Sequence, residues 1–329
     1  MKRKLLALIG CAILAGVALA NAGEARKVRV GLSWHERQSA ITQAWSDYFR
    51  KYSAEYGPKH GLDFVWLEVV GNGEPAQEAS NIEDLINQEV DIIVAWPNNH
   101  ETIGQSILAA REHGIKFVTF DHSSANVQPD AHVGADSYDQ GISTAEAFVD
   151  ILKKNNVKGV CIELMGSLGD PNALARSKAW KEIEGKYGQW KTVAQVPTEW
   201  EPEKFKSGLS NALAANPEAN CLFLGSDFAF ASVQAALEEA GRWAKRGEPG
   251  HIYIASQDIQ PQGYTAMANG YIDVGTTYDA WFHAQKLVEV LAQLANGETV
   301  PVENLVPGRV ATPDNITTLE NIWSRDYKD

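Results

Sequence analysis

The sequence has 329 residues, which is long enough for two mid-sized domains with hydrophobic cores of their own. Hydrophobic residues make up 44% and charged residues 22%, the usual balance of a globular protein, so the composition excludes a wholly disordered chain. The formal net charge of −13 argues against nucleic acid or an anionic membrane surface as a partner.

The N-terminus has the pattern of a secretory signal. Basic residues 2–4 precede an apolar run over residues 5–19, and small residues follow in A-x-A order. We therefore expect cleavage near Ala20 or Ala22 and an exported protein. Cleavage removes three of the 29 positive charges and none of the 42 acidic ones, so the formal charge falls from −13 to −16.

Two other readings of the N-terminus stay open. The apolar run could be a retained anchor, but it has about 15 residues where a bilayer core needs about 20. Residues 8–11 resemble a lipoprotein cleavage box with Cys11 as the lipidated residue. The sequence after Cys11 stays apolar, whereas a lipoprotein usually turns polar there, so ordinary cleavage is favoured.

After the signal, short apolar runs rich in β-branched residues recur along the chain. Most are uniformly apolar, as expected of strands in a parallel sheet that is covered on both faces. The predicted strands are residues 28–32, 64–67, 92–96, 117–120, 159–164, 192–196, 221–224 and 252–255.

Helical patterns, with apolar residues three and four positions apart, lie between these runs. The predicted helices are residues 40–56, 76–88, 102–113, 140–153, 173–186, 205–214 and 229–240. The alternation of strands and helices predicts a parallel sheet with helices on both faces, either as one barrel or as two doubly wound lobes.

The middle of the chain favours two lobes. Residues 133–136 form an extra short strand that interrupts the alternation, and the polar segment 123–130 before it contains Pro129, as a crossing linker would. The predicted fold is therefore α/β, with two doubly wound parallel-sheet lobes joined by a hinge.

Cys161 and Cys221 are the cysteines that remain after cleavage of the signal. Each lies in an apolar run, where a cysteine usually serves as a small buried hydrophobic residue. The two runs are predicted to be neighbouring parallel strands, which favours unpaired thiols. A disulfide stays the alternative in an oxidising compartment.

The sequence carries no motif for catalysis, a cofactor or a metal. The patterns G-x-S-x-G, H-E-x-x-H, C-x-x-C, Walker and G-x-G-x-x-G do not occur, and the eight His residues lack metal-ligand spacing. We therefore expect a binding protein without a cofactor rather than an enzyme.

The signal, the two βα repeats and several strand-end motifs resemble the ribose-binding-like periplasmic sugar-binding proteins of ABC importers. The resemblance covers nearly the whole mature chain. It implies an N-terminal lobe of residues 23–135 plus 279–307 and a C-terminal lobe of residues 136–278 plus 308–329.

The resemblance also implies ligand-binding positions in the N-terminal lobe. The loop after the first strand contains Ser33, Trp34 and Arg37, and the fourth strand ends in Asp121-His122, where the family has Asp-Arg. The family's Asn-Pro-Phe-Phe is absent from that first loop, so Trp34 is a candidate to replace its stacking Phe.

In the C-terminal lobe, a Gly-rich turn after the fifth long strand leads to Asn172 and Arg176. Trp200 lies in a polar loop and is the second candidate to stack on a ligand. The remaining implied ligand residues are Ser226, Asp227, Asp258 and Tyr278.

These residue types suit a sugar. A carboxylate accepts two hydroxyl donors, Arg donates in a fork, and a Trp face covers C–H surface. Asp121, Asp227 and Asp258 lie at carboxyl ends of predicted strands, the edge where ligands bind in open α/β sheets. A strand-end Asp is also a common helix N-cap, and this is an equal alternative for Asp227. We expect Trp96 to pack the floor of the cleft and His35 to be solvated.

The expected function is capture of a sugar or sugar-like polyol between two closing lobes, and delivery by a monomer to an inner-membrane ABC permease. A secreted α/β enzyme acting on a carbohydrate is one alternative. A sensor that presents a sugar or furanosyl signal to a receptor is the other.

Overall fold

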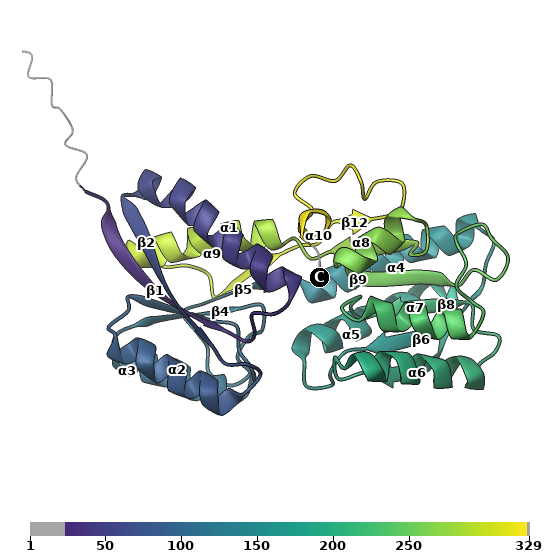
Figure 1. Ribbon diagram of the computed structural model, residues 1–329, viewed down its shortest axis with the longest axis horizontal. Helices are drawn as coiled ribbons and strands as arrows, with labels where there is room; N and C mark the ends of the chain where they lie inside the picture. Colours follow the sequence, from purple (N-terminus) through teal and green to yellow (C-terminus); the bar gives the residue numbers. More distant parts are fainter. Residues whose placement is uncertain (1–23, 328–329) are drawn as a thin grey trace, which may run out of the picture.

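The computed structural model describes residues 24–327. The predicted signal, its cleavage near Ala20 or Ala22 and the alternative of lipidation at Cys11 lie outside the described residues. Within residues 24–327 the chain forms two α/β lobes that lie side by side, each built on a six-stranded sheet (Figure 1). The predicted fold class is confirmed, and the alternative of a single barrel is wrong.

The sheet of the N-terminal lobe has the strand order β11-β5-β4-β3-β1-β2 and is parallel throughout. Apolar side chains of α1 and α9 cover one face, and those of α2 and α3 cover the other. The strands are β1 (Arg26–Trp34), β2 (Leu62–Val70), β3 (Ile92–Ala95), β4 (Lys116–Phe120), β5 (Ala131–Ala135) and β11 (Glu303–Val306). The helices are α1 (Ala40–Tyr56), η1 (Gly57–His60), α2 (Pro75–Asn87), α3 (Ile103–Glu112) and α9 (Ala280–Ala295).

The sheet of the C-terminal lobe repeats this order as β12-β10-β9-β8-β6-β7, except that its edge strand β12 is antiparallel to β10. Helices α4 and α5 cover one face, and α6, α7 and α8 cover the other. The strands are β6 (Gly159–Met165), β7 (Trp190–Pro197), β8 (Cys221–Leu224), β9 (Tyr253–Asp258), β10 (Val274–Thr277) and β12 (Val310–Ala311). The helices are α4 (Ser137–Lys154), α5 (Pro171–Tyr187), α6 (Pro202–Ala215), α7 (Phe230–Glu239), α8 (Pro261–Ala268) and α10 (Trp323–Asp326).

The central strands are uniformly apolar because helices shield both of their faces. All four residues of β3 and all four of β8 are buried. This is the pattern from which the sequence predicted a parallel sheet. Within the described residues, none of the helices combines the length and the apolar character needed to span a membrane.

The chain passes between the two sheets three times over short connections. It leaves the first sheet after β5 to enter α4, returns after β10 to enter α9, and leaves again between β11 and β12. Helix α10 then contacts both α1 and α8, and Trp323 packs in the core of the N-terminal lobe. The last segment, expected to belong to the C-terminal lobe, therefore ends where the two lobes meet.

Cys161 and Cys221 form a disulfide, so the expectation of unpaired thiols is wrong. The two residues are directly paired in the neighbouring parallel strands β6 and β8, with their Cα atoms 4.4 Å apart. That spacing lies within the range that a disulfide requires. The strands were predicted to be neighbours, but the sequence does not specify the register that sets the two residues side by side.

Candidate functional site

Asp121 and Asp258 occupy equivalent places in the two lobes. Asp121 follows β4 and Asp258 ends β9, the third strand in the order of each sheet. Both have a left-handed backbone, with φ of 62° and 77°. Residues other than glycine seldom adopt this conformation, and strained residues of this kind cluster at functional sites. The carboxyl edge of each sheet therefore presents one Asp whose backbone conformation is strained.

Arg176 and Asp258 form a buried ion pair within the C-terminal lobe. The guanidinium donates to both carboxylate oxygens, at 2.7 and 3.2 Å, and to the carbonyl of Gly225 at 2.8 Å. Burial alone would lower the pKa of Arg176, but the charges of Asp258, Asp170 and Asp121 and the hydrogen bond to Asp258 together outweigh burial, and the pKa is raised. The pair is therefore ionised, in the forked geometry that suits a carboxylate.

Asp121 takes its partners from outside its own lobe's sheet. The hydroxyl of Tyr278, in the crossing after β10, donates to its Oδ1. The amide of Asn172, in the first turn of α5, lies 3.4 Å from its backbone carbonyl oxygen. Burial, followed by the charge of Asp121, raises the pKa of Tyr278 well above its ordinary value, so the phenol remains a donor.

His122 completes this group, with its Nε2 atom 3.4 Å from Oδ2 of Asp121. The backbone N–H of Tyr278 donates to the carbonyl of Asp258 at 2.9 Å, which joins the pairs from the two lobes. We call the whole set the central cluster. It comprises Asp121, His122, Asn172, Arg176, Asp258 and Tyr278.

A group of aromatic rings lies beside the central cluster on the N-terminal lobe. The ring of Trp96 lies 5.0 Å from that of His35 and 5.9 Å from that of His122. Trp45 packs edge-on behind Trp96 at 5.2 Å. These rings form an aromatic wall whose planes are inclined to one another, and an aromatic face within such a wall can cover the C–H face of a ligand.

Trp200 lies on the C-terminal side of the site, where its indole nitrogen donates to Asp170 at 3.1 Å. Asp170 also caps α5 by accepting from the backbone N–H of Asn172 at 2.8 Å. A Cβ atom at Gly166 would lie 1.8 Å from the indole of Trp200, so only glycine leaves room for the ring there. Trp200 is half-buried, and its orientation is fixed by both contacts.

Asp227 has a supporting contact that the sequence did not indicate. Its carboxylate accepts from the backbone N–H of Gln260 at 2.9 and 3.1 Å, just before α8, and it does not cap α7. Burial raises its pKa well above the ordinary value. The neighbouring Ser226 accepts from the backbone N–H of Phe228 at 3.1 Å. Both residues lie beside the central cluster and brace the loops around it.

Ser33, Trp34 and Arg37 are not brought into the central cluster. Ser33 and Trp34 are fully buried in β1, and Trp34 packs in the core, where its indole donates to Glu68 at 2.8 Å. Arg37 pairs with the same Glu68 and lies over the Trp34 ring. The interpretation of Trp34 as a residue that stacks on a ligand has no support here, because its ring is fully buried and neither face is open to a ligand.

Three residues near the cluster were not selected from the sequence: His35, Trp96 and Asp170. His35, expected to be solvated, is half-buried against Trp96. Trp96, expected at the floor of the cleft, packs against Trp45 and the two histidine rings. His35 and Trp96 directly follow strands, and Asp170 is the N-cap of α5, so position along the chain was the signal that the sequence offered. Across residues 24–327, no three His, Cys, Asp or Glu residues are grouped so as to hold a metal ion.

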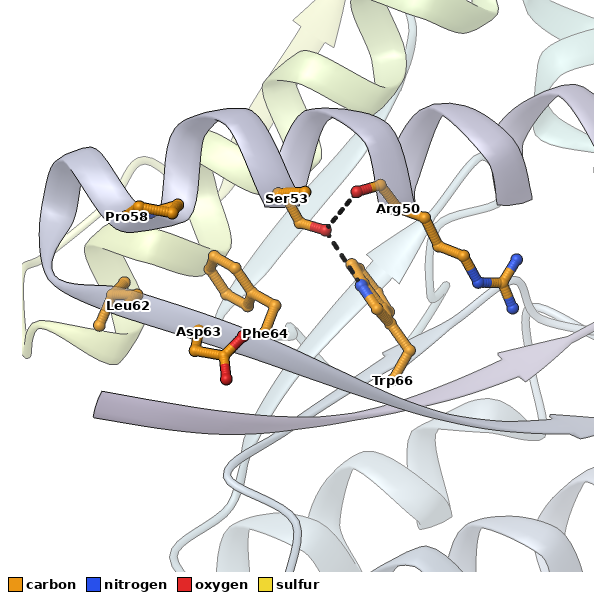
Figure 2. Close-up of a pocket in the computed structure, with 8 residues that line it drawn as sticks. Arg50, Ser53, Pro58, Leu62, Asp63, Phe64 and Trp66 are labelled. Atoms are coloured by element: carbon orange, nitrogen blue, oxygen red, sulfur yellow. Dashed lines mark hydrogen bonds between the residues drawn. The ribbon is translucent and has the colours of Figure 1, made fainter. Parts of the chain in front are cut away.

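A pocket of about 460 Å³ lies elsewhere on the N-terminal lobe, between α1, η1 and β2 (Figure 2). Figure 2 shows Trp66 donating to Ser53, with Phe64 and Arg50 at its sides. The pocket is lined by the first half of β2, and Asp121 follows the carboxyl end of β4. In a parallel sheet these are opposite edges, so the pocket is separate from the central cluster.

Comparisons with known proteins agree with this architecture. A family model described as periplasmic binding protein domain matches residues 30–299. The chain is 26% identical to the D-xylose-binding periplasmic protein of Escherichia coli K12, over 100% of this chain and 97% of that protein. It is 29% identical to the D-apiose import binding protein of Actinobacillus succinogenes, over 75% and 78% of the two chains.

A solved structure with the same fold is an ABC transporter solute binding protein from Bacillus halodurans with bound myo-inositol. Its TM-score is 0.75 and its identity 22%, over 90% of this chain and 98% of that one.

Proposed function

This chain belongs to the family of periplasmic binding protein domains, and on that premise we propose that it captures a sugar or sugar-like polyol between its two lobes. We propose further that it delivers this ligand to the permease of an ABC importer in the inner membrane. Its task is binding rather than catalysis, and it acts as a monomer in the periplasm after loss of residues 1–22.

The observation that carries the proposal is the central cluster. Two acids from equivalent strand ends, one guanidinium and one phenol meet through contacts that join the two lobes. Carboxylates accept hydroxyl protons and a guanidinium donates in a fork, so few groups can satisfy many hydroxyls. Hydrogen bonds to charged groups contribute about 1.5–3 kcal/mol each. A polyhydroxylated ligand matches this set of donors and acceptors.

We assign ligand contacts to the central cluster, with Trp200 and the ring wall covering the apolar faces. The lobes as proposed comprise residues 23–135 plus 279–307 and residues 136–278 plus 308–329. The crossings between β5 and α4 and between β10 and α9 fall at these boundaries. The names of the relatives, which bind D-xylose and D-apiose, favour a ligand of pentose size or a related polyol.

A thermal-shift screen of pentoses, hexoses and polyols tests the proposal. A ligand at about 100 times its Kd stabilises the folded state by about 2.7 kcal/mol, which raises the Tm. The Asp258→Asn variant, which breaks the pair with Arg176, should lose the shift.

Asp314→Asn is the matched control, because it breaks an exposed pair with Arg246 in the same lobe. Its shift should equal that of the wild type. No shift with any compound, or an equal loss of shift in both variants, would refute the proposal.

A further inference from the structure

Two imidazole rings converge on one backbone carbonyl beside the central cluster. Nδ1 of His122 lies 3.2 Å from the oxygen of Pro97, and Nδ1 of His35 lies 3.5 Å from the same oxygen. The two ring centroids are 6.3 Å apart and the planes are nearly perpendicular. One acceptor therefore orients both rings.

This arrangement indicates which ring nitrogens of the two histidines carry hydrogen atoms. A carbonyl oxygen can only accept, so each Nδ1 carries a hydrogen and each ring's remaining choice is at Nε2. Nε2 of His122 lies 3.4 Å from the carboxylate of Asp121, another acceptor. A second hydrogen at that nitrogen satisfies both neighbours, which makes His122 an imidazolium. A second cation at His35, one ring away, is disfavoured by repulsion.

We propose that His122 is the cation of the N-terminal half of the site, that His35 stays neutral beside it, and that ligand affinity therefore has a maximum in pH. This inference rests on the proposed function. It assigns His35 to the site and gives the two histidines different charge states.

The charged groups around His122 support this assignment. Burial lowers its pKa, but Asp121, Asp170 from the loop before α5, the Pro97 carbonyl and Glu78 from α2 outweigh burial, and the pKa is raised above 6.5. The positive neighbours are His35, after β1, and His132, on β5, which carry charge only when protonated.

The pKa of His35 is shifted in the opposite direction. Burial first, and then the charge of His122, lower its pKa below 6.5, against smaller opposing effects of the Pro97 carbonyl, Glu36 and Asp121. At neutral pH the pair thus consists of one charged and one neutral ring.

The sign of the pH dependence follows from the acids that the lobes bring together. The charge of Asp121 acts on Asp258 across the lobes and helps to raise its pKa, and the charge of Asp170 acts on His122 across the lobes and helps to raise its pKa. Loss of the His122 proton at higher pH removes the positive charge beside Asp121 and Asp170, whereas Asp258 keeps Arg176, so closure around a ligand weakens. Protonation of His35 at lower pH sets two cations side by side and also weakens it.

Two measurements on the chain without residues 1–22 test the inference. The first is NMR titration of the imidazole signals, assigned with His122→Gln. His122 should titrate above 6.5, and Asp121→Asn should lower its pKa by about one unit or more. A value at or below 6.5, or no response to Asp121→Asn, overturns the proposed charge state whether or not a ligand binds.

The second measurement is Kd from about pH 5 to about pH 9 for a ligand from the thermal-shift screen. His122→Gln should bind about tenfold more weakly near neutrality, the loss expected for one charge-assisted hydrogen bond. In His122→Arg the guanidinium stays charged, so whatever its affinity near neutrality, that affinity should no longer fall at high pH. The control is His113→Gln, an exposed histidine on α3's C-cap, which should match the wild type.

A flat pH profile of Kd in the wild type, or an unchanged high-pH fall in His122→Arg, overturns the inference while leaving sugar binding in place. Absence of binding at every pH refutes the proposed function instead.

Discussion

The two lobes share one strand order but satisfy their equivalent acids in different ways. In the C-terminal lobe, Asp258 is neutralised by Arg176 from the same lobe. In the N-terminal lobe, Asp121 depends on Tyr278 from a crossing segment and on Asn172 from the opposite lobe. One half of the site is therefore held by contacts within its own lobe, and the other half depends on contacts from outside its lobe.

The cores differ as well. The C-terminal lobe has a disulfide between its central strands and a stack of Trp180 on Phe223 at 4.4 Å. The N-terminal lobe has two buried histidines instead, His132 and His283, close beneath Asp121. The comparison teaches that the lobe whose ion pair forms within it also contains the disulfide, whereas the other lobe places two buried histidines beneath its acid.

The largest expected effect on stability concerns the disulfide in the C-terminal lobe. The Cys161→Ala, Cys221→Ala double variant removes a link across 60 residues. In the chain-entropy model this lowers the free energy of unfolding by about 4 kcal/mol. Urea unfolding of the oxidised wild type and the variant measures the difference. Addition of reductant should weaken only the wild type; equal stability of the two proteins would contradict the role of the disulfide.

The next effect concerns the N-terminal lobe at low pH. Burial lowers the pKa of His132 to about 4, from an ordinary 6.5. As pH falls from 7 to 4 the unfolded chain binds a proton at this residue and the folded chain does not, so stability is lost. The loss amounts to about 3 kcal/mol by pH 4.

His132→Asn should escape that loss, so its unfolding free energy relative to wild type should rise by about 3 kcal/mol between pH 7 and pH 4. Urea unfolding at a series of pH values measures it. Because the other titrating groups are common to both proteins, their contributions cancel. A difference that stays constant with pH would show that His132 is not held neutral.

The smallest effect concerns the junction between the lobes. Tyr278→Phe removes the donor to Asp121 and should lower the free energy of unfolding by about 2 kcal/mol, as expected for a buried hydrogen bond to a charged group. Tyr327→Phe is the control, because its hydroxyl also donates to an acid, Asp47 at 3.0 Å, but at the exposed surface. Equal losses of unfolding free energy in the two variants would show that the buried hydrogen bond of Tyr278 stabilises the protein no more than the exposed one of Tyr327.

Much of the fold was predictable because it depends on local patterns. Uniformly apolar runs such as residues 92–96 indicated buried parallel strands, and the structure has β3 at Ile92–Ala95. Strands β10, β11 and β12 and helices α8 and α9 were missed. Strand β12 has only two residues, and its pairing with β10 is set by tertiary contacts. The pairing of Cys161 with Cys221 was unpredictable for a similar reason, because it depends on strand register.

The site was predictable where a residue ends a strand. Asp121 and Asp258 were expected at the carboxyl edges, and the structure joins them through Tyr278. The sequence did not predict whether a side chain at that edge points into the core or toward the site. Trp34 turns into the core, whereas Trp96 lies against the two histidines. Both are single Trp residues at strand ends, so only three-dimensional packing separates them.

The order of the chain has a consequence for how the molecule assembles during synthesis. Helix α9 and strand β11 complete the N-terminal lobe, and they follow the entire run from α4 to β10. The first lobe to begin emerging from the ribosome is thus the last that can close. The continuous segment from α4 to β10 has its own sheet and can fold earlier, although domains usually fold from the N-terminus onward. Until α9 and β11 have been synthesised, the early strands expose an apolar face that chaperones would need to shield.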